Sequence, residues 1–230
     1  MKKILFSDRF GLTDAVLSGQ KTMTRRIMPQ QPRIDDCLEW GIDDKGKAYV
    51  AIYGATWLCD IYPAYQIGEE VAIAQAYQTL RWPALPGIDW KAITDEVTHS
   101  KGWTNKMFVK AEYMPHRIKI TDIKLERLND ITEEDCSKEG IICVNFRQWL
   151  KQDLDDFSPQ EYVDHDLWTL PIFRSGIENG WEEQSKDDIA SYTAKTAFIV
   201  LFAKLLHKSP SEVNALNPWL FAYEFKLIKD

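Results

Sequence analysis

A basic segment near the start of the chain combines side chains that can act chemically on a ligand. Residues 19–26 read Gly-Gln-Lys-Thr-Met-Thr-Arg-Arg, which contains the spacing G-x-K-x-x-T-x-R. In an extended strand, alternate residues face the same side, so Thr24 and Arg26 would share a face that Lys21 can reach. An ammonium, a hydroxyl and a guanidinium that converge suit an anionic or hydrogen-bonding ligand. Taken alone, the spacing is also compatible with a solvated basic turn without a ligand.

Two elements must position this segment. Residues 3–7 are predicted to form a first strand, and Thr13 is predicted to cap a short helix that stops at Gly19. Glycine suits the left-handed position that follows a helix. The basic segment then follows as a strand or loop, so its backbone and side chains are presented to the same place.

A second helix brings a carboxylate to an unusual position. Thr132 is predicted to cap it, with acidic residues 133–135 in its first turn, where they suit the helix dipole, and Gly140 ends it. Glu139 therefore lies at the carboxyl end of the helix, where the helix dipole disfavours an anion. This position favours a role for Glu139 other than stabilising the helix. Cys136 lies three residues earlier on this helix, where a small buried thiol is expected rather than a nucleophile.

The rest of the chain alternates short strands with scattered helices. A hairpin turn is predicted at 43–47, strands at 48–53, 71–77, 117–128 and 219–227, and helices at 90–97, from 158, at 192–207 and from 209. Strand 117–128 changes parity at residues 121–122, which indicates a β-bulge or two bent strands. Without regular βαβ units, the pattern predicts an α+β fold with a small β-barrel and flanking helices.

Composition and charge limit the partners. Hydrophobic residues make up 45% of the 230 residues, enough for one sizeable core. The net charge of −7 argues against general binding of nucleic acid, which needs clustered Lys and Arg. Residues 1–34 nevertheless carry a net +5, whereas residues 133–190 carry a net −10. This asymmetry predicts one localised site for an anionic ligand, beside an acidic face that would repel bulk RNA.

Several classes of protein are not expected. The four cysteines form no CxxC pair, and no His stands at a zinc-finger offset, so we expect no metal site, no cofactor and free thiols in a reducing cytoplasm. The first residues are too short for a signal segment, and no stretch approaches about 20 apolar residues, so no membrane contact is expected and the predicted location is cytoplasmic. The oligomeric state is left open.

Several segments resemble a known family in the order in which they occur. They are residues 4–7, the basic segment 19–26, Ile-Gly-Glu-Glu-Val at 67–71, residues 117–128, the block 130–135 followed by Glu139-Gly140, and Asn-Pro-Trp at 217–219 with the last strand. The chain resembles the ASCH (activating-signal-cointegrator homology) domains of the PUA-like superfamily, especially the longer phage and prophage members. The resemblance implies a single domain over residues 1–230, with insertions at about 79–110 and 143–192.

The resemblance also implies a cleft for RNA, a nucleoside or a nucleotide. A small bacterial member of the superfamily is an amidohydrolase that removes the acetyl group from N4-acetylcytidine. Carried over residue by residue, Lys21 matches its general base, Thr24 its nucleophile and Glu139 its proton donor. The expected ligand-binding residues are Gly19, Arg25, Arg26, Gln75 and Arg117.

This chemistry depends on the pKa of one lysine. A threonine hydroxyl is a weak nucleophile until a base takes its proton. Lys21 can be that base only if burial or a nearby cation lowers its pKa, and Arg25 or Arg26 could supply that cation. Glu139 would raise the same pKa, and the sequence leaves the balance open.

Three functions remain possible at this point: a binding module for RNA or a modified nucleoside, a hydrolase of N-acylated pyrimidine nucleosides, and an interaction protein of a phage or mobile element. Where phage-type ASCH proteins usually carry an Arg-Glu pair, this chain has Ala74 and Gln75, which favours binding over catalysis. Trp82, Trp90 and Trp103 can stack on bases or pack against the fold, and packing is the more common role.

Overall fold

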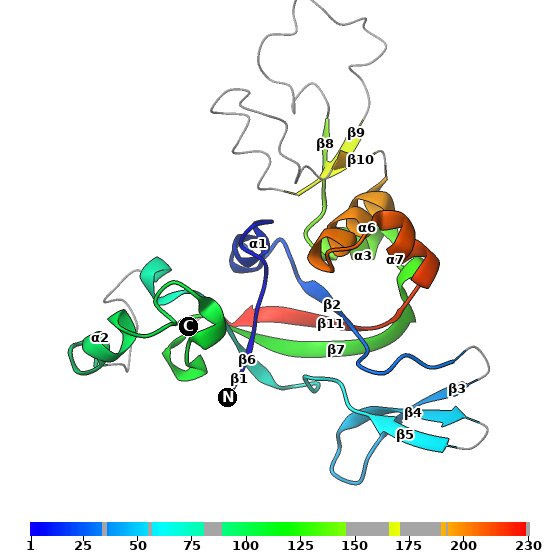
Figure 1. Ribbon diagram of the computed structural model, residues 1–230, viewed down its shortest axis with the longest axis horizontal. Coiled ribbons are helices and arrows are strands. Elements are labelled where there is room, and N and C mark those ends of the chain that lie inside the picture. Colours follow the sequence, from blue (N-terminus) through cyan, green and yellow to red (C-terminus); the bar gives the residue numbers. More distant parts are fainter. Residues whose placement is uncertain are drawn as a thin grey trace, which may run out of the picture.

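The computed structural model describes residues 1–33, 36–54, 57–80, 89–145, 166–170, 190–191 and 193–228. Its main sheet has the strand order β1-β6-β7-β11-β2 (Figure 1). These strands are β1 (Lys2–Ile4), β6 (Glu70–Ile73), β7 (Arg117–Arg127), β11 (Trp219–Ile228) and β2 (Met23–Ile27). Strands β1 and β6 are parallel, and the other pairs are antiparallel. Strands β1 and β2 are therefore the two edges of the sheet.

The long pair of β7 and β11 forms the centre of the sheet and bends within it. Glu224 pairs with Asp122, whereas the next residue, Phe225, pairs with Ile120. Thr121 is thus an extra residue on β7, which is the definition of a β-bulge. The change of parity in the sequence left two alternatives, a β-bulge or two bent strands, and the structure shows the first: one strand with a bulge.

Two smaller sheets and several helices surround the main sheet. One small sheet consists of β3 (Cys37–Ile42), β4 (Ala48–Gly54) and β5 (Trp57–Ile61), and the other of β8 (Ile142–Asn145), β9 (Asp166–Thr169) and β10 (Ala190–Ser191). The α-helices are α1 (Leu12–Leu17), α2 (Trp90–Thr98), α3 (Glu133–Lys138), α6 (Ala194–Leu205) and α7 (Pro210–Leu216). Single 3-10 turns are η1 (Tyr77–Thr79), η2 (Lys106–Phe108), η3 (Ala111–Tyr113) and η4 (Leu128–Asp130).

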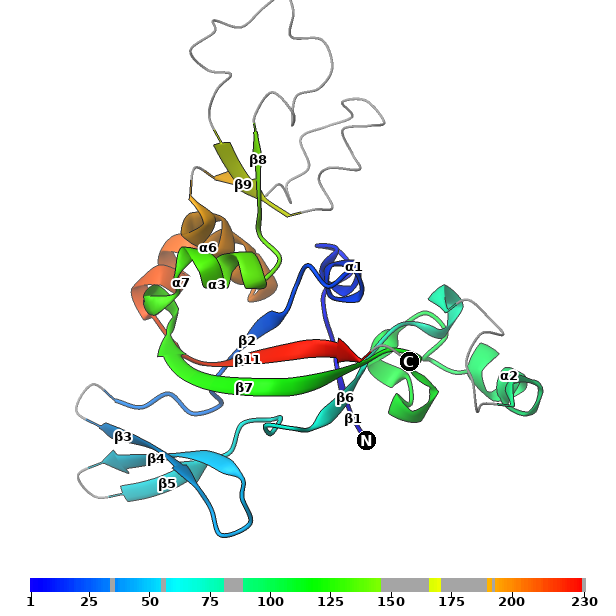
Figure 2. The ribbon, with the colours of Figure 1, turned by 180° about the vertical axis from the view of Figure 1, so that it is seen from behind.

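These elements lie on opposite sides of the main sheet. Helices α3, α6 and α7 lie on one side of β2, β11 and β7, and the β3–β5 sheet lies on the other (Figures 1 and 2). The main core joins all of these layers: Phe198 of α6, Ile52 of β4 and Phe225 of β11 belong to one buried cluster. A second cluster, which includes Tyr77, Val97 and Met114, holds the 89–114 segment against β6.

Several predicted elements are confirmed. The turn at 43–47 joins β3 to β4, α2 covers the helical turns predicted at 90–97, and α6 covers most of 192–207. Ser209 and Glu212 form the capping box predicted for α7. The helix predicted from residue 158 lies outside the described residues. The molecule is a mixed α+β protein, and no helix in the described part is long and apolar enough to cross a membrane.

The predicted cap of α1 is wrong. Gly11, with a φ of 62°, is the N-cap, and Thr13 lies inside the helix. The Thr13 hydroxyl donates to the carbonyl of Phe6 and to the carboxylate of Asp8, so it is committed to the preceding loop.

Two predicted strands are shorter than expected. The strand predicted at 3–7 ends at Ile4, because the next carbonyls, those of Leu5 and Phe6, accept side-chain donors instead of a neighbouring strand. The strand predicted at 71–77 ends at Ile73. Beyond it, the amide of Gln75 donates to the sulfur of Met114, and the chain turns towards the 102–114 segment.

Candidate functional site

The loop between α1 and β2 delivers Lys21 into the interior. Gly19 has a φ of 78°, as expected for the residue that ends the helix. The Lys21 amide then donates to the carbonyl of Ala15 at 2.8 Å, and the Thr22 amide donates to the carbonyl of Lys138 at 2.8 Å. The second bond ties this loop to the end of α3, where Glu139 is the C-cap residue.

Lys21 and Glu139 form a buried ion pair. Lys21 is 2% exposed and Glu139 is 3% exposed. The Lys21 ammonium nitrogen donates to Oε2 of Glu139, and also to its backbone carbonyl at 2.8 Å. Gly140 follows with a φ of 97°, and a Cβ at that position would lie 3.5 Å from the Cβ of Lys21. That distance is an ordinary van der Waals contact, so it is the left-handed turn that requires glycine at this position.

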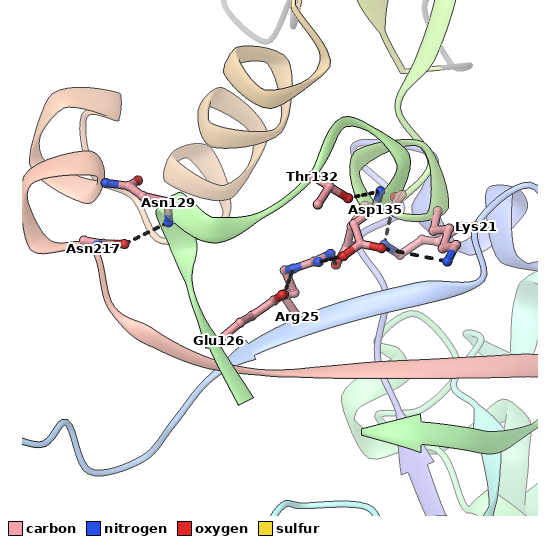
Figure 3. Close-up of polar contacts among 9 residues, drawn as sticks. Lys21, Arg25, Glu126, Asn129, Thr132, Asp135 and Asn217 are labelled. Atoms are coloured by element: carbon pink, nitrogen blue, oxygen red, sulfur yellow. Dashed lines mark hydrogen bonds and ion pairs between the residues drawn. The ribbon is translucent and has the colours of Figure 1, made fainter. Parts of the chain in front are cut away.

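Arg25 connects this pair to two further carboxylates (Figure 3). Its side chain is fully buried, and its Nε lies 2.6 Å from Oε1 of Glu126. Its Nη2 lies 3.0 Å from Oδ2 of Asp135, and its Nη1 lies 3.1 Å from Oε1 of Glu139. The guanidinium also lies 5.6 Å from the ring centroid of Phe198 on α6. We call the two cations and three carboxylates the ion cluster; its members are Lys21, Arg25, Glu126, Asp135 and Glu139.

The structure settles the balance of effects on Lys21. Burial is the largest influence, and it lowers the pKa of Lys21 from its ordinary value of 10.5. Glu139 raises this pKa, while Arg26 and Arg25 lower it further, and the net direction is downwards. For Arg25, burial alone would lower the pKa, but Glu139 and Glu126 outweigh it and raise the pKa. The two cations of the cluster therefore differ: Arg25 holds its proton more firmly, and Lys21 releases it more easily.

A small pocket of about 40 Å³ lies against the ion cluster. Its polar side is formed by Lys21, Thr24, Arg25, Arg26 and Glu139. Its apolar wall comes from α6, through Phe198, Leu201, Phe202 and Leu205. The remaining lining comes from residues 5–7 and Leu12. Because these residues come from both edges of the main sheet, we call it the seam pocket.

Thr24 and Arg26 lie on the face of β2 opposite to Arg25. Thr24 is 5% exposed and pairs with Tyr223 of β11. The Thr24 hydroxyl has no hydrogen-bond partner among the residues that the structure describes, and Thr24 lines the seam pocket. Arg26 is exposed, and its Nη2 donates to the carbonyl of Leu5 at 2.6 Å. That bond joins β2 to the segment that follows β1 across the seam.

Three of the expected ligand-binding residues do not line the pocket. Gly19 acts through the turn before Lys21. Gln75 follows β6, and its Oε1 is buried without a hydrogen-bond partner. Arg117 begins β7, where it pairs with Ala72 and Ile228. The structure thus brings together Lys21, Thr24, Arg25, Arg26 and Glu139, and leaves these three outside.

Sequence reasoning missed two members of the ion cluster. Asp135 was interpreted only as a charge that suits the helix dipole, and Glu126 only as part of a strand. The register of β7, β11 and β2 brings Glu126 to Arg25, 101 residues away in the chain. No local signal in the sequence marks that pairing. The apolar wall from α6 was predicted as a helix face, but its position over β2 was not.

The cysteines and tryptophans considered from the sequence are not among the described residues that line the seam pocket. Cys136 is fully buried, and burial raises the pKa of its thiol to about 12, as expected for a packing residue. Cys37, Cys59 and Cys136 are free thiols. Trp103 packs partly buried against the second cluster, whereas Trp82 lies outside the described residues.

Within the described ranges, no group of three or more His, Cys, Asp or Glu is placed to hold a metal ion. The cation among the carboxylates Glu126, Asp135 and Glu139 is the guanidinium of Arg25. Searches of protein-family models, curated proteins and solved structures found no match to this chain.

Proposed function

We propose that this chain is an ASCH-type protein of the PUA-like superfamily that binds a modified nucleoside at the seam pocket and hydrolyses an amide bond on it. The observation that carries the proposal is that one pocket is lined both by a buried lysine with a lowered pKa and by a threonine whose hydroxyl has no partner among the described residues. Groups with strongly perturbed pKa values in pockets are frequent at functional sites. The segments that resemble the ASCH family are also those that supply the polar side of this pocket.

The arrangement of the sheet supports the PUA-like barrel. Its two edge strands approach each other at the seam, where Arg26 donates to the carbonyl of Leu5. Nearby, the amide of Ala64, in the segment that leads to β6, donates to the hydroxyl of Tyr223 at 2.9 Å. These side-chain bonds link parts of the sheet that are not neighbours in its strand order, as a curled sheet requires.

The residues suit acyl transfer. Lys21, once deprotonated, can accept the proton of the Thr24 hydroxyl, and the activated oxygen can attack an acyl carbon. Arg26 lines the pocket, and those of its N–H groups that have no partner among the described residues can hold an anionic or carbonyl oxygen there. Arg25 has three carboxylate partners, so we assign it to the ion cluster and not to the ligand.

The size of the pocket limits what enters it. Sites that enclose a drug-sized ligand usually measure about 300–1,000 Å³. A volume of about 40 Å³ admits a small acyl group, while the base and sugar would remain at the mouth near Arg26. The net charge of −7 favours such a small ligand over extended RNA.

The direct test is incubation with N4-acetylcytidine, followed by chromatographic detection of cytidine. We expect turnover in the wild type, and a loss of about 10²–10⁴-fold in Lys21→Ala, which removes the base. Lys47→Ala, which changes an exposed lysine that is not part of the pocket lining, is the matched control and should keep wild-type turnover. Absence of cytidine with wild-type protein at high concentration would rule out this reaction.

The second candidate function is binding without chemistry. It is favoured by Ala74 and Gln75, which replace the Arg-Glu pair usual in phage-type ASCH proteins. The two functions differ in the response to Thr24→Ala. A hydrolase loses turnover and keeps its affinity, whereas a binder loses about 1 kcal/mol of affinity, the contribution of one hydrogen bond. Calorimetry with the same nucleoside measures that difference.

A further inference from the structure

The hydrogen bonds of Lys21 leave one position of its nitrogen open. An ammonium has three N–H donors, whereas a neutral amine has two donors and one lone pair. The Lys21 nitrogen donates to two acceptors, Oε2 and the backbone carbonyl of Glu139, and the described residues provide no third. The remaining position carries a proton in one state and a lone pair in the other. Lys21 lines the seam pocket, so we take a group bound there as the partner for that position.

The carboxylate of Glu139 is occupied on both sides. Its Oε2 accepts from Lys21, and its Oε1 accepts from Nη1 of Arg25 at 3.1 Å. Arg25 is in turn fixed by Glu126 and Asp135 (Figure 3). To donate a proton, Glu139 would have to carry it on an oxygen that already accepts an N–H from a basic side chain. Hydrogen bonds from such donors favour the ionised carboxylate.

We propose that Glu139 remains ionised as a positioning residue, and that Lys21 both takes and gives the reacting proton. The proposal rests on the amide hydrolysis proposed above, and it reverses the role of proton donor that the family resemblance implies for Glu139. In this arrangement Thr24 is the nucleophile, Lys21 is the base, and Glu139 is the charged third group that orients the base. The same three roles occur in catalytic triads.

Protons and bonds balance when Lys21 works in both directions. In acylation, the Thr24 oxygen bonds to the acyl carbon, its proton moves to the Lys21 lone pair, and the carbonyl becomes an oxyanion. When the carbonyl re-forms, the carbon–nitrogen bond breaks and the leaving nitrogen takes the proton from Lys21. In deacylation, water gives a proton to Lys21 and its oxygen bonds to the acyl carbon. The Thr24 oxygen then leaves with that proton, which yields a carboxylic acid and an amine.

The charged neighbours of Lys21 are few. Glu139 approaches it from the end of α3, and Arg25 and Arg26 influence it from β2. The α6 wall supplies no titratable group, because it consists of Phe198, Leu201, Phe202 and Leu205. A change in the charge of Glu139 should therefore change the pKa of Lys21 directly.

The test is a titration of both groups in the wild-type protein by NMR, with ¹³C in glutamate carboxyls and ¹⁵N in lysine amines. The Glu139 and Lys21 signals are assigned by their loss in Glu139→Gln and Lys21→Met. At neutral pH, we expect the Glu139 signal to be that of a carboxylate, because both of its oxygens accept N–H groups. The pKa of Lys21 should lie below the ordinary lysine value. A protonated Glu139 carboxyl at neutral pH, or a Lys21 signal with an ordinary pKa, would overturn the proposal.

Two further measurements separate a positioning role from a structural one. In Glu139→Gln, the pKa of Lys21 should fall below its wild-type value, because Glu139 raises it; an unchanged pKa contradicts the proposal. With N4-acetylcytidine, kcat/KM should rise with pH along a single limb, whereas a carboxylic acid donor would give a bell. If the wild type shows no turnover, the proposed reaction fails, and the NMR titration still decides the charge of Glu139.

Discussion

The seam pocket and a second, larger cleft contain similar side chains in different surroundings. The larger cleft has a volume of about 650 Å³ and lies between the β3–β4 turn and the segment before β6; we call it the lysine cleft. Its lining is Lys2, Asp43, Lys45, Lys47, Tyr62, Pro63, Gln66, Ile67 and Glu69. Both sites combine lysines with carboxylates, and the larger one has more lysines.

The difference lies in burial. In the lysine cleft, Asp43 accepts the backbone amides of Lys45 and Lys47, and the exposed Lys2 pairs with Glu69. Water screens these charges, and such exposed pairs contribute little to stability. In the seam pocket, Lys21 is 2% exposed and its pKa is lowered mainly by burial. Neither the volume of a pocket nor the number of its charges identifies the lysine whose pKa is lowered; the removal of that lysine from water does.

The largest expected effect comes from Arg25. In Arg25→Met, the buried Asp135 and Glu139 and the partly buried Glu126 lose their shared cation, which should cost about 3–5 kcal/mol of unfolding free energy. Arg26→Met, at the next residue of the same strand, removes an exposed guanidinium and should cost about 0.5 kcal/mol. Urea denaturation of both variants measures the contrast. Similar losses at the two positions would show that burial does not distinguish them.

The pH dependence of stability should distinguish Lys21 from the lysines of the cleft. Because its pKa is lowered on folding, the unfolded chain binds the Lys21 proton more tightly than the native protein does. Stability attributable to Lys21 therefore rises with pH between its lowered pKa and 10.5, with a slope of up to about 1.4 kcal/mol per pH unit. The slope is obtained by subtracting the curve of Lys21→Met, which removes other titrations. Lys47→Met should leave the slope in place.

A smaller effect is expected at the helix that carries Glu139. The Thr132 hydroxyl accepts the amide of Asp135 at the start of α3, and Thr132→Ala should cost about 1 kcal/mol. Ser209→Ala removes the matching cap of α7 and should cost about the same. Only Thr132→Ala should also change the titration of Lys21, because only α3 ends at Glu139. If both variants alter Lys21 equally, general destabilisation is the cause.

The smallest effect is expected in the lysine cleft. Lys2 lies 3.0 Å from the Glu69 carboxylate, and its side chain is 52% exposed. Lys2→Met should change the unfolding free energy by less than about 1 kcal/mol, and added salt should reduce the change further. Thermal unfolding at low and high ionic strength measures both. A loss as large as that of Arg25→Met would remove the contrast between the two sites.

Local sequence signals predicted much of the framework. The bulge at Thr121, the cap at Thr132, the capping box at Ser209 and the turn at Gly19 were all predicted, because each depends on a few adjacent residues. The prediction of a cap at Thr13 was wrong, because this position depends on contacts beyond the adjacent residues of the helix. The Thr13 hydroxyl bonds to residues of the preceding loop, which no local cap rule considers.

For the site, the sequence by itself determined which groups are available: a lysine, a threonine and two arginines at fixed spacing, and a glutamate at a helix end. Only the tertiary structure decided how these groups differ in burial and in their charged partners. It turned Arg25 towards three carboxylates and left Arg26 exposed at the seam, and it covered Lys21 so fully that burial outweighs Glu139 in setting the direction of its pKa. The physical reason is desolvation. The loss of water around a charge depends on what packs over it, and here the covering residues come from α3 and α6, more than 100 residues further along the chain.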